Sequence, residues 1–219
     1  MKIQQTIIRF PEMELLTRDS AKLRGFFGNF FMKESPILHN HYEDGSLRYK
    51  YPLVQYKVIN KIPHLVGFEE GASLLQSLFL RITEINIDDR EYQINSKNIT
   101  VTEEELKLED DISFYKFVTL WVALNQKNFG EYINCRNILE KEIMLEKILT
   151  GNILSFYKAF NFRVSEKIIV KLNFQQRDTT FKNKDLIGFN AVFATNAQIP
   201  NLAGIGKSVA RGYGTIIKV

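Results

Sequence analysis

Two histidines, His39 and His41, stand one residue apart in the stretch SPILHNHY, in a chain that has only three histidines among its 219 residues. The unperturbed pKa of histidine is about 6.5, so near neutrality one ring can accept a proton while its neighbour donates one. In an extended backbone, residues i and i+2 point to the same face about 6.6 Å apart, so both rings could flank one phosphate. This pairing suits RNA cleavage without a metal, in which a base deprotonates a ribose 2′-hydroxyl and an acid protonates the leaving 5′-oxygen.

The same pair has two simpler interpretations. The rings could be solvated loop side chains, or they could form half of a zinc site, since zinc takes histidine nitrogen and cysteine sulfur. The further soft ligands are His64 and Cys135, and neither has a local ligand spacing. His64 alternates with Ile62 and Val66, which favours a packed strand residue over a third catalytic group.

Composition limits the class of protein. A chain of 219 residues with 45% hydrophobic content can bury the core of one large domain or two small ones. No apolar run approaches 18 residues, and the N-terminus lacks the apolar core of a signal peptide, so we expect no membrane association. A single free cysteine excludes an internal disulfide framework and predicts a reducing cytoplasmic location.

Charge is distributed unevenly. Residues 102–111 contain six acids and one lysine, a local net charge of −5. Since the formal net charge of the whole chain is +4, the rest of the chain carries +9. The tail from Asn196 to Val219 has three basic residues and no acid. Basic surface separated from an acidic segment is typical of a protein that binds a polyanion.

The first half of the chain predicts a β-α-β-β-α-β unit. Alternating residues predict the strands, and apolar residues at i, i+3 and i+4 predict the helices, the first after Asp19 or Ser20 as cap and the second opening at Glu69. The tight turn Asn60-Lys61 joins the middle strands. The predicted strands are 4–10, 47–59, 62–68 and 83–94. Together they indicate a ferredoxin-like domain over residues 1–97.

A second domain is expected over residues 98–219. Its acidic start, 102–111, is interpreted as a linker or a solvated edge. A strand at 112–124 is followed by a helix at 131–149, which Gly151 should end, and by paired strands at 166–177 and 185–195. A short strand at 215–219 closes the chain. The fold class predicted is α+β, with two tandem ferredoxin-like domains.

The tail GIGKSVARGYG, residues 204–214, repeats the pattern glycine, apolar residue, glycine at both ends. Glycines let a backbone approach phosphates, and Lys207 and Arg211 add charge. The tripeptide Gly206-Lys207-Ser208 is not a P-loop, because Asn201 stands where the first glycine belongs and only 11 residues follow Ser208.

This tail resembles the C-terminal glycine-rich loop of the RAMP superfamily of CRISPR-associated proteins, in particular its repeat-RNA endoribonucleases. The blocks KLRGFFGNFF, ILHNH, RYKYPLVQYKVI and GFEEGA resemble the branch of that family that is built on a histidine pair. The likeness is strongest over residues 22–72 and 204–214, and weakest in the acidic segment and the long middle helices.

The resemblance implies two ferredoxin-like domains and cleavage of CRISPR repeat transcripts into guide RNAs without metal or cofactor. The products would be a 2′,3′-cyclic phosphate and a 5′-hydroxyl. His39 and His41 match the family's histidine pair as general base and general acid, in either order. The glycine-rich loop matches an RNA-facing segment. The residues that the resemblance assigns to RNA in this loop are Gly204, Gly206, Lys207, Arg211, Gly212 and Gly214.

Proximity to the histidines in sequence adds further candidates. Basic side chains there could neutralise the pentavalent phosphorane, and Tyr42 could stack on an unpaired base. Solvated surface roles are equally open for all six. The basic candidates are Lys22, Arg24, Lys33, Arg48 and Lys50.

Two other functions remain open at this point. A non-catalytic RNA-binding subunit of a CRISPR interference complex would share the fold and the glycine loop but would not need the histidine pair. A metal-binding regulatory protein would retain zinc. The partner expected is CRISPR repeat RNA, and association as a homodimer or with other CRISPR-associated subunits is left open.

Overall fold

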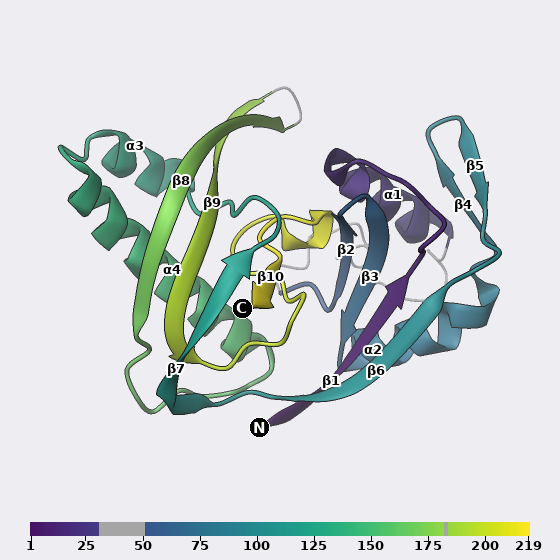
Figure 1. Cartoon of the computed structure of the whole chain (residues 1–219), viewed down its shortest axis with the longest axis horizontal. Coiled ribbons are helices and arrows are strands. Elements are labelled where there is room, and N and C mark those ends of the chain that lie inside the picture. The colour runs from purple at the N-terminus through teal and green to yellow at the C-terminus, as the bar shows by residue number, and fades with distance from the viewer. Residues whose placement is uncertain (31–50, 182–183) are drawn as a thin grey trace, which may run out of the picture. The chain divides into compact units, whose positions relative to one another are not determined.

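The computed structural model of the chain describes residues 1–30, 51–181 and 184–219. These residues form two compact units. The N-terminal unit comprises Lys2–Glu104 together with Val209–Gly212. The C-terminal unit comprises Met1, Glu105–Ser208 and Tyr213–Val219. In the part of the chain that is described, a four-stranded sheet is the centre of each unit (Figure 1).

Among its described residues, the N-terminal unit has two α-helices, α1 and α2, and a main sheet in the order β2-β3-β1-β6. Short 3-10 turns, η1 and η3, precede α1 and follow α2. The elements are β1 Lys2–Arg9, η1 Thr17–Asp19, α1 Ser20–Phe30, β2 Val54–Ile59, β3 Ile62–Phe68, α2 Glu70–Leu78, η3 Phe79–Arg81, β4 Glu84–Ile87, β5 Arg90–Gln93 and β6 Asn98–Glu105.

Alternation along the strands sets the core of this unit. Tyr56 on β2 is buried against Phe27 of α1, with ring centroids 5.8 Å apart, and Leu75 of α2 belongs to the same cluster. The turn between β2 and β3 has positive φ at both Asn60 and Lys61, the conformation of a two-residue hairpin turn. The predicted turn is therefore confirmed, and it aligns Ile59 with Ile62.

The fourth strand of this unit differs from the prediction. Residues 83–94 were expected to form it, but they form the separate hairpin β4–β5, which reverses at Asp88, where φ is +53°. β6 lies beside β1 instead. Of the two interpretations of the acidic stretch, the solvated edge is confirmed and the linker is wrong: its first part is in β6, an edge strand of mostly exposed residues, and its last part begins β7.

The C-terminal unit has one sheet in the order β10-β7-β9-β8, and α3 and α4 lie together on one side of it (Figure 1). The inner side of α4 is buried through Leu145, Leu149, Ile153 and Phe156. The elements are β7 Leu108–Phe117, α3 Gln126–Ile133, α4 Ile138–Ala159, β8 Val170–Phe181, β9 Lys184–Ala197 and β10 Ile216–Lys218.

Two predictions in this unit are wrong. The strand expected over 112–124 ends at Phe117, and Trp121 makes only an isolated bridge to Phe189. The helix break falls at residues 134–137, whereas α4 continues through Gly151. A helical glycine costs only about 1 kcal/mol, which the burial of Leu149 and Ile153 on the opposite side outweighs.

The two sheets have the same order of strands. Reading β6 and β10 as the fourth strand of their units, each sheet runs fourth, first, third, second. This is the arrangement of a β-α-β-β-α-β unit. The chain is therefore an α+β protein of two tandem ferredoxin-like folds. The C-terminal one has residues 198–215 in place of a second α-helix, and η4 Val209–Arg211 within them belongs to the N-terminal unit.

Candidate functional site

Eight of the predicted site residues lie in the described part of the chain, and six lie outside it. The predicted catalytic pair is among those outside. The residues outside are Lys33, His39, His41, Tyr42, Arg48 and Lys50. The described ones are Lys22, Arg24, Gly204, Gly206, Lys207, Arg211, Gly212 and Gly214.

Two of the predicted residues, Arg24 and Arg211, come together in the N-terminal unit. Arg24 is on α1 and Arg211 is the last residue of η4, and both side chains are half-buried. Burial lowers the pKa of Arg24, and the positive charge of Arg211 lowers it further. Two guanidinium groups within each other's field form a site at which an anion such as a phosphate would be stabilised.

Gly212 explains how Arg211 reaches this position. Its φ is +84°, and a Cβ there would lie 2.6 Å from Ser20 Oγ and 3.1 Å from the carbonyl oxygen of Tyr56. Any residue other than glycine would therefore push η4 away from α1 and β2. The glycine that the sequence pattern singled out brings Arg211 to Arg24.

The other glycines of the tail act within the C-terminal unit. Gly206 has φ of +106°, and a Cβ there would lie 2.7 Å from Trp121 Nε1. Gly214 has φ of +63°, and a Cβ there would clash with the carbonyl oxygen of Ile205. Gly214 N donates to Leu120 O at 2.9 Å, and Ile205 N donates to Gly214 O at 2.8 Å. Gly204 is buried and bridges to Thr215. These glycines fix the path of the tail on either side of η4.

Lys207 stands at the exposed turn of this tail. Its backbone N–H donates to Val122 O at 3.1 Å, which fixes the main chain, while burial of its side-chain stem lowers the pKa of its ammonium group. No carboxylate of a described residue forms an ion pair with it. Its charge is thus available to a phosphate.

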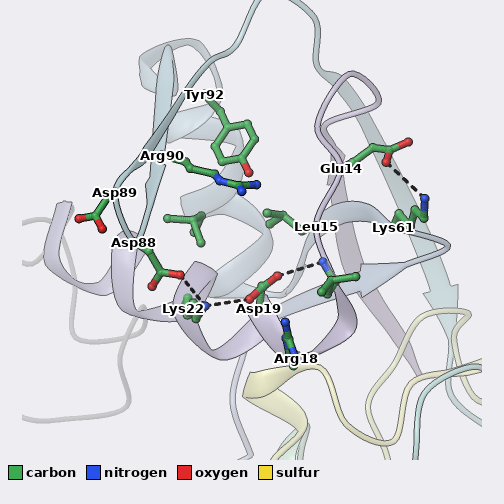
Figure 2. Close-up of a pocket in the computed structure, with 12 residues that line it drawn as sticks. Glu14, Leu15, Arg18, Asp19, Lys22, Lys61, Asp88, Asp89, Arg90 and Tyr92 are labelled. Atoms are coloured by element: carbon green, nitrogen blue, oxygen red, sulfur yellow. Dashed lines mark hydrogen bonds and ion pairs between the residues drawn. The ribbon is translucent and has the colours of Figure 1, made fainter.

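Lys22 is in a different environment. Its Nζ lies 3.0 Å from Asp19 Oδ1 and 2.6 Å from Asp88 Oδ2, and these carboxylates raise the pKa of Lys22. Figure 2 shows the ammonium group between the two aspartates. A phosphate would have to compete with both carboxylates for Lys22, so this lysine is a weak candidate for phosphate binding.

The same lysine lines a hollow of about 490 Å³ in the N-terminal unit. The walls of the hollow come from the segment before α1, from the β2–β3 turn and from the β4–β5 hairpin (Figure 2). Its four cations are matched by four carboxylates, and Lys61 Nζ lies 3.4 Å from Glu14 Oε2. A hollow with balanced charge does not concentrate a polyanion, so it is not the RNA site that the sequence predicts.

His64 is a packed strand residue, as predicted. It is 6% exposed, and its Nδ1 lies 2.8 Å from Ile62 O. Burial, with the nearby charges of Arg9 and Lys57, lowers the pKa of His64 to about 4. The ring is therefore neutral near pH 7.

Lys57 is a residue that the sequence analysis did not single out. It lies on β2 directly opposite His64 on β3, it is fully buried, and burial lowers its pKa to about 7. The signal was present in the alternation of Gln55 and Lys57 against Val54, Tyr56 and Val58, because that alternation places the lysine on the face of His64.

The described residues contain neither a metal-binding cluster nor a membrane-spanning helix. Within 1–30, 51–181 and 184–219, no group of three or more His, Cys, Asp or Glu side chains could hold a metal ion. Cys135, which the zinc hypothesis invoked, donates its thiol hydrogen to Glu131 O at 3.4 Å. No helix in these ranges is long and apolar enough to cross a membrane.

Solved structures and one curated relative resemble the chain along much of its length. A crystal structure of Cas6b matches with a TM-score of 0.95 and 35% sequence identity, and the match covers 100% of this chain and 100% of that one. A crystal structure of a CRISPR RNA processing endoribonuclease Cas6b has a TM-score of 0.81 and 32% identity over 100% of both chains. An uncharacterized protein of Methanocaldococcus jannaschii is 37% identical over 143 residues, 65% of this chain and 97% of that protein.

More distant structures share the fold alone. A RAMP protein that binds different RNA substrates has a TM-score of 0.59 at 10% identity, over 100% of this chain and 99% of that one. Two family models match in tandem and together span nearly all of the sequence. The Cas6b N-terminal domain matches residues 1–105, and the Cas6b C-terminal domain matches residues 107–219. The chain belongs to the Cas6b family.

Proposed function

We propose that this protein is a metal-independent endoribonuclease that cleaves CRISPR repeat transcripts into guide RNAs. The observation that carries the proposal is the match of both halves of the chain to the Cas6b family, together with the full-length likeness to a CRISPR RNA processing endoribonuclease. The described residues add a basic pair on the N-terminal unit, Arg24 and Arg211, held together by Gly212.

The reaction we assign to His39 and His41 is a transfer within the RNA backbone. One imidazole removes the proton of a ribose 2′-hydroxyl, whose oxygen attacks the adjacent phosphorus. The bond from phosphorus to the 5′-oxygen breaks, and the other imidazole, as imidazolium, protonates that oxygen. The products are a 2′,3′-cyclic phosphate and a 5′-hydroxyl, and imidazole suits both transfers because it can accept a proton as well as donate one.

Basic side chains of the protein would hold the RNA through its phosphates. Arg24 and Arg211 are suited to a phosphate because guanidinium groups bind phosphate oxygens bidentately, and Lys207 offers a further charge. Among the residues outside the described ranges, Lys33, Arg48 and Lys50 would neutralise the phosphorane. Tyr42 would stack on a base.

Single-turnover cleavage in excess EDTA tests the proposal. Wild-type protein should cut repeat RNA, and His39→Ala or His41→Ala should slow the reaction by roughly 10²- to 10⁴-fold, the usual contribution of a general acid or base. His64→Asn is the matched histidine control, because that ring is buried and neutral, and its cleavage rate should stay near that of the wild type. Thermal unfolding shows whether each variant is folded.

An intact RNA that is nevertheless bound tightly would favour the alternative, a subunit that holds guide RNA without cutting it. Cleavage that appears only after a divalent metal is added would contradict the metal-independent mechanism. We expect the reaction in the cytoplasm, where the single cysteine stays reduced. Molar mass measured with and without repeat RNA distinguishes a monomer from a homodimer.

A further inference from the structure

The sheet of the C-terminal unit has one covered face and one exposed face. On β7, Tyr115 and Phe117 point to the side of α4 and are buried. Between them in the alternation, Phe114 is 54% exposed, and Val192 on β9 is 42% exposed. Ile112, two residues before Phe114, is 42% exposed, so the second side of this sheet presents an aromatic ring and two branched aliphatic side chains to solvent.

Phe114 and Val192 lie at the middle of the sheet. The order β10-β7-β9-β8 makes β7 and β9 the central strands (Figure 1). Phe114 pairs with Ala194, and Lys116 pairs with Val192, so Phe114 and Val192 are diagonal neighbours on adjacent strands. A flat phenyl ring beside a low aliphatic surface is a platform on which one planar group can stack.

Amide side chains flank this platform on the side of β8. Asn173 and Gln175 on β8 point to the same side, opposite Val192 and Asn190 of β9 respectively, and all three polar residues are exposed. Amide side chains can both donate and accept hydrogen bonds, as the edges of nucleobases do. They lie beside Val192, on the β8 side of the platform, and could recognise a base there.

The charges of this face have one sign. Lys116 and Arg177 lie on it and are exposed, and Arg177 Nη2 donates to Gln175 Oε1 at 2.8 Å. Lys171, at the edge, is in an ion pair with Glu146. No residue on this side of strand segments 112–116, 171–177 or 190–194, all of them described, is a carboxylate. These segments therefore present no negative side chain that would repel the phosphates of an RNA strand.

We propose that this face, centred on Phe114, is a stacking platform for an unpaired base of the RNA, separate from the residues assigned above. The inference rests on the proposed function, since it takes RNA as the substrate. A sheet whose exposed aromatic residue accepts a base, with amides and cations around it, is a way in which proteins bind single-stranded RNA. The amides and cations beside Phe114 favour RNA over a protein partner, because the core of a protein–protein interface is depleted in charged residues.

Equilibrium binding tests this platform without interference from cleavage. The probe is fluorescent single-stranded repeat RNA with 2′-O-methyl sugars, which prevent attack by the 2′-oxygen. Phe114→Ala should weaken binding roughly tenfold, within the range measured when a stacking aromatic residue is removed, and Phe114→Trp should retain it. Phe129→Ala is the matched control, because this phenylalanine on α3 is 45% exposed and lies off the platform.

Fluorescence gives a second measurement. The indole of the Phe114→Trp variant should be quenched when the RNA binds, while Trp121, which is fully buried, should give wild-type protein little change. A two-stranded, fully paired RNA duplex should bind equally well to wild type and to Phe114→Ala, since its internal bases offer no free face for stacking.

Three outcomes would overturn the proposal. One is equal affinity of wild type and Phe114→Ala for the single-stranded probe while wild type still cuts repeat RNA, in which case the platform fails and the nuclease proposal stands. Another is a lower molar mass of Phe114→Ala with unchanged affinity, which assigns the face to self-association. The third is a wild-type protein that binds no RNA, in which case both proposals fail.

Discussion

The N-terminal and C-terminal units share one order of strands and use it in opposite ways. In the N-terminal unit two helices cover one side of the sheet, and the other side is also buried, including Lys57 and His64. In the C-terminal unit only the first helical position is filled, by α3 and α4, and the far side of the sheet exposes Phe114. One order of strands can therefore bury polar side chains in one unit and present an exposed face in the other.

The second difference is the segment that replaces a helix in the C-terminal unit. Residues 198–215 contain the glycine-rich tail, and their middle part, Val209–Gly212, belongs to the N-terminal unit. A helix could not supply η4 to α1 and β2 in this way. The irregular path of this stretch lets it bring Arg211 to Arg24.

The largest effect on stability is expected from Gly214→Ala. A Cβ at this position meets the carbonyl oxygen of Ile205, and the positive φ of +63° adds strain, so we expect a loss of about 2–4 kcal/mol in the free energy of unfolding. Urea unfolding measures it. The matched control is Gly151→Ala in α4, where a Cβ meets nothing within 4 Å and stability should rise by about 0.5–1 kcal/mol. Equal effects of the two substitutions would contradict the role given to the tail.

The next effect concerns the arginine pair. Arg24→Gln and Arg211→Gln should each weaken RNA binding roughly tenfold and lower the dependence of log affinity on log salt by about one. Lys22→Gln sharpens the comparison, since that ammonium is already in ion pairs with Asp19 and Asp88 and its loss should matter less. Titrations at several salt concentrations give both quantities. If Lys22→Gln proved as harmful as Arg24→Gln, the anion site would extend into the hollow of Figure 2.

The smallest effect, taken per pH unit, is a pH dependence in the N-terminal sheet. Burial lowers the pKa of Lys57 from 10.5 to about 7, so between these values the unfolded chain binds more protons than the folded one. The contribution of Lys57 to the free energy of unfolding therefore falls as pH decreases from about 10.5 to about 7, by at most about 1.4 kcal/mol per pH unit. Lys57→Met should gain stability relative to wild type over this range.

Urea unfolding at several pH values between 7 and 10.5 measures the difference for Lys57. Lys61→Met is its control, because the ammonium of Lys61 is on a side chain that is 64% exposed. Parallel pH profiles for wild type and Lys57→Met would show that Lys57 is not buried as a neutral amine.

Local patterns were enough to predict much of this fold. The alternation around His64 and the Asn60-Lys61 turn depend on neighbouring residues, and both predictions are confirmed. The reversal at Asp88 was missed, because it depends on a positive φ at a residue that also suits a strand end. β6 was interpreted as a linker or solvated edge, because an exposed acidic edge strand lacks the apolar alternation that identifies strands.

The candidate site was predictable only in part, for a similar reason. Spacing identified the glycines of the tail, and the structure gives Gly212 and Gly214 the positive φ that makes them necessary. The meeting of Arg24 and Arg211 depends on contacts between segments far apart in the chain, which no local pattern contains. The same holds for the exposed position of Phe114. Alternation along a strand separates two faces but does not say which of them is buried.

The claim at the centre of this account is that a ribose 2′-hydroxyl attacks the scissile phosphate without a metal. The most direct test is to map the cleavage position in repeat RNA in EDTA and identify the ends of the fragments. We expect a 2′,3′-cyclic phosphate upstream and a 5′-hydroxyl downstream, and a single 2′-deoxy sugar at the mapped position should abolish the cut. Fragments that carry a 3′-hydroxyl and a 5′-phosphate would contradict the claim.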